Sequence, residues 1–226
     1  MKEHFQGEIE ELKSNLIRMA SVVDDQVDKA ITALETGNIE LCKGVKARDL
    51  EVDAYDNLIQ TQCENIIALF QPVAIDLRLV MSAIMINNNL ERCGDIAVNI
   101  SQRVKKAGSE RSLIEESRII EMARIAQSML KNAIDSFIRN DTDIASQVIA
   151  SDEKVDYLNK QLFNFLVAKM QSNPELIEAC THLVVMTRHI ERMADHATNI
   201  AENLVFYVEA KIIAHRKKLD DKIGKN

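Results

Sequence analysis

The chain has 226 residues, of which 46% are hydrophobic and 28% are charged, a balance typical of globular proteins with a buried core. Its formal net charge of −7 argues against a nucleic-acid backbone as the main partner, because phosphate binding requires clustered Lys and Arg. The most basic stretch, Lys211 to Lys222, is diluted by Asp220 and Asp221, and we interpret it as a solvated helix end. Two prolines, six glycines and no tryptophan leave few interruptions, which favours long helices.

Neither the N-terminus nor the cysteines indicate export. The opening stretch MKEHFQGEIEELK is acidic and amphipathic, unlike a signal peptide, and the most apolar run, Leu77 to Ile86, is too short to span a membrane. The cysteines form no Cys-x-x-Cys pair and lie within apolar segments, as reduced core residues of cytosolic proteins do. They are Cys42, Cys63, Cys93 and Cys180. We therefore expect a cytoplasmic protein without direct membrane insertion, which docks at the inner membrane, if at all, through protein partners.

Apolar residues recur every three or four positions in the first half, which predicts three amphipathic helices. The expected stripes are Ile9, Leu12, Leu16, Met19, Val23, Val27, Ala30 and Leu34, then Leu41, Val45, Val52, Tyr55, Ile59, Ile66 and Leu69, then Ile86, Leu90, Cys93, Ala97, Ile100 and Val104. Breaks are expected at Thr36-Gly37-Asn38, at Gln71-Pro72 and at Ala107-Gly108-Ser109. Each break contains residues that end or cap helices.

The second half repeats this plan with helices expected over Glu115 to Asn140, over Asp141 to Ser172 and from Pro174 to about Lys218. A proline at a helix start costs no hydrogen bond, because that amide has no intrahelical partner. Short connections make consecutive helices antiparallel neighbours. We therefore predict an all-α fold of two tandem, duplicated three-helix bundles, residues 1–108 and residues 109–226, with the boundary near Gly108 to Arg111.

Two matching stretches indicate that the chain is a duplication. LERCGDIAVNI at residues 90–100 and IERMADHATNI at residues 190–200 share Glu, Arg, Asp, Ala, Asn and Ile at equivalent places. A second match occurs in the same order, because Asp49, Val52 and Asp53 recur one repeat later, as Asp152, Val155 and Asp156. A repeated unit of about a hundred residues therefore carries the same acidic pattern twice.

The repeated carboxylates lie on helix faces opposite the apolar stripes. On a helical wheel that advances by about 100° per residue, Asp95 falls about 40° from Glu91, whereas the apolar stripe that includes Cys93 and Ile100 is centred nearly opposite. Each half contributes two such acidic stripes, one from its second helix and one from its third. They are Asp49, Asp53 and Asp56 with Glu91, Asp95 and Asn99, and Asp152 and Asp156 with Glu191, Asp195, Asn199 and Glu202.

The two stripes of each half are expected to meet. Asp49 and Asp53 precede Pro72 by 23 and 19 residues, and Glu91 and Asp95 follow it by 19 and 23. A tight turn at the proline therefore brings them to the same height. Four such carboxylates repel one another and raise one another's pKa values unless a cation is present, and hard oxygen ligands suit Mg²⁺, Ca²⁺, Mn²⁺ or iron. The alternative is an ordinary solvated face; we favour a metal site on each bundle because the pattern is duplicated.

At these residues the sequence resembles the PhoU family, the phosphate-signalling accessory proteins of bacterial phosphate transport systems. The motifs that carry the resemblance are PVAIDLR at 72–78, LERCGD at 90–95 and IERMADHATNIAE at 190–202. The similarity runs from about Phe5 to Tyr207. Two departures are Asn89, where members often have an acidic residue, and Ala194, where glycine is common.

The resemblance implies two three-helix bundles, a homodimer, and iron or zinc clusters on the surface. The ligands that it implies are Asp49, Asp53, Glu91 and Asp95 in the first half and Asp152, Asp156, Glu191 and Asp195 in the second, with Asn99, Asn199 and Glu202 as further contacts. Three histidines, His182, His189 and His196, recur every seven residues between the apolar and acidic stripes, and we expect them at a bundle flank or a dimer contact. His196, beside Asp195, is the best candidate to support a ligand.

The resemblance also implies a function. It is that of a non-catalytic negative regulator, which connects the ATPase subunit of a phosphate ABC transporter to a sensor histidine kinase and represses phosphate-starvation genes when phosphate is plentiful. The sequence contains no phosphate-binding glycine loop, zinc-protease helix or hydrolase elbow, which agrees with a protein that is not an enzyme. Two alternatives stay open: a helical accessory regulator of an ion-coupled phosphate carrier, and a carboxylate-metal helical enzyme or metal store.

Overall fold

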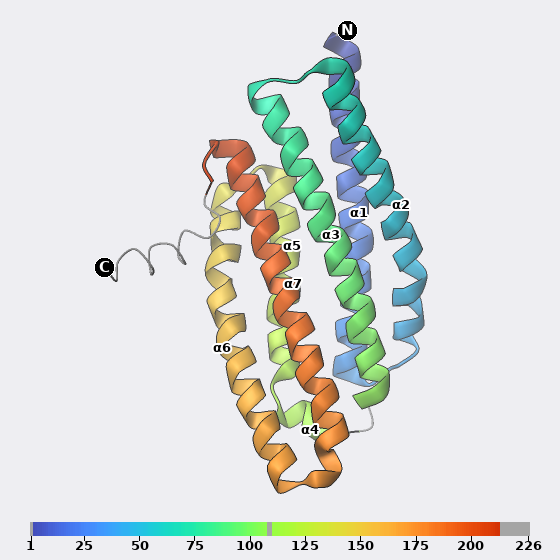
Figure 1. Ribbon diagram of the computed structural model, residues 1–226, viewed down its shortest axis with the longest axis vertical. Helices are drawn as coiled ribbons and strands as arrows, with labels where there is room; N and C mark the ends of the chain where they lie inside the picture. The colour runs from blue at the N-terminus through green and yellow to red at the C-terminus, as the bar shows by residue number, and fades with distance from the viewer. Residues whose placement is uncertain (1, 108–109, 213–226) are drawn as a thin grey trace, which may run out of the picture.

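The computed structural model describes residues 2–107 and 110–212, and every regular element within them is helical (Figure 1). The first half consists of α1 (Lys2–Thr36), α2 (Leu41–Phe70) and α3 (Ala74–Ala107). The second half consists of a short α4 (Arg111–Glu116), α5 (Ile119–Arg139), α6 (Thr142–Ser172), the 3₁₀ turn η1 (Pro174–Leu176) and α7 (Ile177–Glu209). The all-α fold of two three-helix bundles is confirmed. The division at residue 108 stays a prediction, and residues 108 and 109 lie outside the described part.

The two halves lie side by side along their length (Figure 1). Helices α3 and α7 run through the middle, α2 and α6 flank them, and α1 and α5 lie behind. The halves meet through two helix pairs, α3 with α7 and α1 with α5. The central α7 also packs on α5 and α6, so that buried side chains of both halves form one continuous apolar core.

Local chemistry explains where most helices begin and end. Gly37 adopts φ +75°, a conformation that costs glycine little, and its amide donates to the Ala33 carbonyl at 2.9 Å to close α1. Gln71 adopts the left-handed conformation after α2. The Asp141 side chain accepts hydrogen bonds from the amides of Asp143 and Ile144 at 3.0 and 3.1 Å, which caps α6.

The predicted bounds of two helices were wrong. The helix expected over 115–140 is interrupted at Ser117, whose hydroxyl accepts from the Ile119 amide, and at Arg118, which is left-handed with φ 60°. The last helix ends at Glu209 instead of near Lys218, because Ala210 turns left-handed and donates its amide to the Phe206 carbonyl at 3.0 Å. Residues 213–222 of the predicted basic helix end lie outside the described part.

The predicted apolar stripes form the core, with one exception. Every residue of the α1 stripe is at most 3% exposed, and the α3 stripe from Ile86 to Val104 is buried throughout. Leu69, predicted to pack inward, is instead 73% exposed in the last turn of α2. The helical period continues to that position, but α2 ends at Phe70, so no neighbouring helix covers the side chain.

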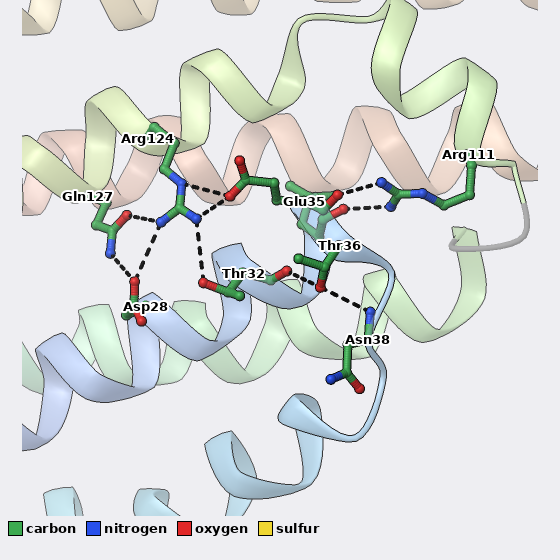
Figure 2. A network of polar contacts seen from close by, with 9 residues as sticks. Asp28, Thr32, Glu35, Thr36, Asn38, Arg111, Arg124 and Gln127 are labelled. Carbon is green, nitrogen blue, oxygen red and sulfur yellow. Dashed lines mark hydrogen bonds and ion pairs between the residues drawn. The ribbon is translucent and has the colours of Figure 1, made fainter.

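A polar network joins α1 to α5 (Figure 2). The Arg124 guanidinium donates to the Glu35 carboxylate and lies 3.4 Å from the Asp28 carboxylate, while Gln127 donates to Asp28 at 2.9 Å. Nearer the start of the second half, Arg111 donates to the Leu34 carbonyl at 2.7 Å. These contacts fix the end of α1 against the second half. The last carbonyls of a helix have no backbone N–H partner within it, and Arg111 supplies a side-chain donor in their place.

A second polar seam lies between α3 and α7. Its contacts are Arg78 Nε to the Tyr207 carbonyl at 3.3 Å, Ser82 Oγ to the Asn203 carbonyl at 3.1 Å, Asn89 Oδ1 with His196 Nδ1 at 2.9 Å, and Arg103 with His182 Nδ1 at 3.2 Å. From one of these contacts to the next, the residue number on α3 increases by the same amount as the residue number on α7 decreases. The two helices therefore run antiparallel and keep one register along their length. Two of the three regularly spaced histidines therefore lie between the two halves, where they contact α3.

Candidate metal-binding surface

The first carboxylate cluster lies between α2 and α3. Burial raises the pKa of Asp49, and the neighbouring charges of Asp53 on the same helix and Asp95 on α3 raise it further. Carboxylates from the two helices are therefore close enough to repel one another, as the spacing around Pro72 predicts. Asp53 is exposed, whereas Asp49 and Asp95 are partly buried.

Glu91 lies deepest in this cluster, with a side chain that is 21% exposed. Burial raises its pKa, Asp95 adds to the rise, and the Arg92 guanidinium opposes it. Arg92 lies 3.3 Å from Glu91 and 3.3 Å from Asp95, so one arginine partly neutralises two carboxylates. Asp56, on the same α2 stripe, accepts from Asn87 at 2.7 Å. Arg92 was not part of the predicted site.

The second cluster, between α6 and α7, has a similar arrangement. Burial raises the pKa of Glu191, Asp195 adds to it, Arg188 opposes it, and Asp156 of α6 raises it again. The Glu191 side chain is only 13% exposed and forms an ion pair with Arg188. Asp152 lies one turn before Asp156 on α6 and is partly buried. The structure thus brings carboxylates of two helices together in each half.

The donor chemistry of both clusters fits a hard cation. Glu91 Oε2 and Glu191 Oε2 are buried from solvent and accept no hydrogen bond. Glu91 Oε2 has Arg92 Nε as an ion-pair partner at 3.3 Å, whereas the ion pair of Glu191 with Arg188 is formed by its other oxygen, Oε1. Among the described residues, however, no three His, Cys, Asp or Glu side chains converge as a ready-made metal site. Side-chain rotation would be needed to gather them. Metal binding, the ligand set and the identity of the metal stay predictions.

The further predicted contacts lie on the same helices. Asn99 and Glu202 are partly buried on α3 and α7. Asn199 and His196 point toward α3, where their side chains contact Asn89 Oδ1 at 3.4 and 2.9 Å. Asn89, which departs from the acidic residue common in the resembling family, thus bonds with the opposite half. A role of these residues in supporting metal ligands stays a prediction.

Sequence reasoning missed a buried side chain beneath the first cluster. Gln26 of α1 is 0% exposed, and a hydrogen bond from its amide opposes the rise in the Asp49 pKa. It lies against Gly94, next to Asp95. The carboxylate pattern contains no sign of it, because α1 has no acidic stripe in the duplication. One feature of the sequence hints at a close neighbour here. Gly94 precedes Asp95, whereas the larger Ala194 precedes Asp195 in the second half.

The fold and its paired carboxylate clusters define a duplicated all-α protein with two equivalent acidic surfaces. The chain belongs to the PhoU domain family, whose model matches residues 16–104 and 119–204, one match in each half. Two relatives are named phosphate-specific transport system accessory protein PhoU homolog. The one from Caulobacter vibrioides is 35% identical over 94% of this chain and 94% of its own length, and the one from Aquifex aeolicus is 38% identical over 92% and 95%.

Solved structures of this family have the same fold. PhoU from Pseudomonas aeruginosa superposes with a TM-score of 0.86 at 30% identity, over 92% of this chain and 100% of that one. The phosphate transport system regulatory protein PhoU from Streptococcus pneumoniae superposes with a TM-score of 0.84 at 27% identity, over 92% and 99%. Within the described residues, none of the helices has the length and apolar character needed to cross a membrane.

Proposed function

We propose that this chain is a regulator of a phosphate transport system. The observation that carries the proposal is the match of both halves to one family, together with relatives named as accessory proteins of phosphate-specific transport. The chain spans 94% and 95% of the length of these two relatives, so the proposal rests on similarity over nearly their whole length.

The finer role is that of a cytoplasmic, non-catalytic adaptor. It connects the ATPase subunit of a phosphate ABC transporter to a sensor histidine kinase and acts as a homodimer that keeps starvation genes off when phosphate is plentiful. Long helices expose much surface for contacts with two partners, which suits docking more than catalysis. The adaptor holds metal, iron or zinc, through the two carboxylate clusters.

The residues that hold the metal are Asp49, Asp53, Glu91 and Asp95 in one half and Asp152, Asp156, Glu191 and Asp195 in the other. A bound cation supplies positive charge to carboxylates whose pKa values are raised by burial and by one another. The chain itself contributes the pairing of helices that brings the carboxylates together. Arg92 and Arg188 supply part of the same compensation from within the protein.

Gene deletion tests the regulatory role. A strain without this chain should express alkaline phosphatase and related starvation genes in phosphate-rich medium, and the wild-type gene should restore repression. Purified protein should retain the transporter ATPase subunit and the kinase in a pull-down, in the presence and absence of a chelator. Normal repression in the deletion strain, with neither partner retained, contradicts the adaptor role.

Two other outcomes would redirect the proposal. Retention of an ion-coupled phosphate carrier in place of the ABC transporter would make the chain an accessory protein of that carrier. Metal-dependent turnover or bulk metal storage by the purified protein would indicate a carboxylate-metal enzyme or store. The pull-down and the metal assay separate these outcomes from the proposed role.

A further inference from the structure

A cavity lies at one end of the seam between α1 and α5, on a side of the molecule remote from the carboxylate stripes. Its volume is about 580 Å³, and side chains of α1, α3, α5 and α7 line it. Helices α1 and α5 run antiparallel, since Asp28 contacts Gln127 and Glu35 contacts Arg124. The cavity therefore lies where α5 ends, beside the first half of α1, and both halves of the chain contribute to it.

The two ends of this seam are equivalent places in the duplicated fold. The shift of 103 positions that relates Asp49 to Asp152 also relates Gly37 to Asn140. Gly37 follows the end of α1 and Asn140 follows the end of α5, and both adopt a left-handed conformation. The surroundings of the two helix ends can therefore be compared directly.

The end of α1 is covered by α4. The Arg111 guanidinium lies against the last turn of α1 (Figure 2) and donates to the Leu34 carbonyl at 2.7 Å. Leu113 and Ile114 of α4 are buried in the core. At the end of α5 the described residues contain no such short helix, and Ile138 is 46% exposed. One end of the seam is thus closed, whereas the other has room for a separate molecule.

The floor of the cavity is apolar. Leu79 of α3 and Phe137 of α5 are buried, and Ile17 and Ile138 are exposed at its sides. Ile17, Phe137 and Ile138 also line a small apolar gap that reaches Ile200 of α7. An occupant with an apolar body would remove these side chains from water, which is favourable.

The charged lining residues favour an anion. Lys13 lies 3.4 Å from the Glu10 carboxylate, whereas Arg18 is exposed and forms no ion pair within the described part of the chain. The two cations and one carboxylate of the lining leave a net positive charge. A guanidinium binds a phosphate group through two parallel hydrogen bonds, so Arg18 is suited to hold one.

The size of the cavity indicates an organic ligand. Sites for small organic molecules occupy about 300–1,000 Å³, far more than a single phosphate ion needs. A nucleoside phosphate combines an anionic group with a flat base. Tyr207 adds an aromatic ring to the lining and Asn140 adds a side-chain amide. Aromatic rings stack on bases, and amides form hydrogen bonds with base edges.

We propose that this cavity binds a nucleoside phosphate. The phosphate lies at Lys13 and Arg18, and the base covers Ile17 and Ile138. The ligand contacts both halves, so that its binding stabilises the folded protein and the seam that the Arg124 network closes further along. This site goes beyond the proposed function and requires neither a bound metal nor a protein partner.

Calorimetric titration of the full chain with AMP tests the proposal, with adenosine and inorganic phosphate as separate arms. The charge-assisted hydrogen bonds of the phosphate and the burial of the base should each improve affinity by about tenfold or more. AMP should therefore bind at least about tenfold more tightly than either adenosine or phosphate.

Substitutions in the lining separate the two parts of the ligand. Arg18→Gln should weaken AMP binding by about tenfold or more and leave adenosine binding unchanged. Ile138→Ser should weaken the binding of AMP and of adenosine by similar factors. The matched control is Lys160→Gln, which removes one positive charge at an exposed position of α6 outside the lining and should keep the AMP affinity. All three positions are exposed, so thermal unfolding without ligand should be nearly unchanged.

Hydrogen exchange locates the ligand, because AMP should slow exchange at the end of α5 and in the first half of α1 while leaving α4 unchanged. A wild-type protein that binds no AMP overturns the proposal. An AMP affinity that survives Arg18→Gln, or protection confined to other helices, overturns the assignment to this cavity. Phosphate or adenosine that binds as tightly as AMP excludes a nucleoside phosphate as the ligand class. The deletion strain and the metal assay judge the proposed function separately, since neither depends on this site.

Discussion

Asp95 and Asp195 occupy equivalent positions, one turn after the half-buried Glu91 and Glu191. Replacing both with asparagine should reduce bound metal at least about tenfold. Loss of a residue that merely supports a ligand typically lowers metal affinity by about 10- to 100-fold, and loss of a ligand itself should lower it at least as much. Helicity should be unchanged, since the ion pair of Asp95 with Arg92 is about half exposed to solvent, and such pairs contribute little to stability. Elemental analysis of the purified variant measures the metal, and circular dichroism measures the helices. Unchanged metal content would contradict the ligand assignment.

His196 makes the stability of the protein depend on pH. Burial, with Arg192 and Arg92 nearby, lowers its pKa from 6.5 to about 4. Between pH 6.5 and pH 4, position 196 binds a proton more readily in the unfolded chain than in the folded protein. The free energy of unfolding should therefore fall as the pH falls from 6.5 toward 4. The slope is at most about 1.4 kcal/mol per pH unit, and partial exposure reduces it.

Urea unfolding at a series of pH values measures this effect. His196→Gln keeps a donor for Asn89 but cannot titrate, so its stability should fall less between pH 6.5 and 4.5. The exposed His4 provides a control, because His4→Gln should leave the slope unchanged. A His196→Gln protein with the same pH dependence as wild type would refute the assignment.

The acidic residues of the site could be predicted because their chemistry is visible in the sequence. Asp49, Glu91 and their repeats stand out through duplication, and the spacing around each proline predicts that they meet. Gln26 and Arg92 could not be found in this way. A glutamine within an amphipathic helix and an arginine beside a glutamate are ordinary features, and their roles depend on which side chains another helix brings near.

At the scale of elements, the helical period predicted the long helices, and glycine or proline located the first two breaks. The break at Ser117 and Arg118 was missed because apolar residues continue through Ile119 and neither residue ends helices by preference. The end at Glu209 was missed because Ala210, an excellent helix former, adopts a left-handed conformation there. Local propensity therefore did not indicate where this helix ends.

Inward-facing positions of α3 and α7 should not accept charge. Leu90 and Ile190 are 1% and 0% exposed, so Leu90→Asp or Ile190→Asp places an unpaired carboxylate in the core. Each should lower the free energy of unfolding by at least about 3 kcal/mol. Leu50→Asp is the matched control, since Leu50 is 77% exposed on α2, and it should change stability by less than about 0.5 kcal/mol. Chemical denaturation compares the three, and a stable Leu90→Asp protein would show that the assigned faces are inverted.

At the scale of the whole molecule, the sequence indicates two similar halves but not how they join. Arg124 with Glu35 and Asn89 with His196 are polar contacts between segments about a hundred residues apart, and nothing in the helical period pairs them. The structure adds that buried side chains of both halves form a continuous core. Duplication thus produced one packed body, in which the central α7 packs on α3 of the other half as well as on α5 and α6 of its own.

This packing predicts that the described halves unfold together. Since α3 packs along α7 and shares its core, loss of the first half exposes apolar and polar groups of the second to solvent. Leu90→Asp should therefore destabilise α5 to α7 as much as α1 to α3, although the substitution lies in the first half. Hydrogen exchange by mass spectrometry in intermediate urea measures both halves in one sample, and Ile190→Asp provides the reciprocal case. If peptides of α5 to α7 keep wild-type protection while those of α1 to α3 exchange, the halves are separate folding units, and the packing of α3 on α7 and the polar network in Figure 2 couple them only weakly.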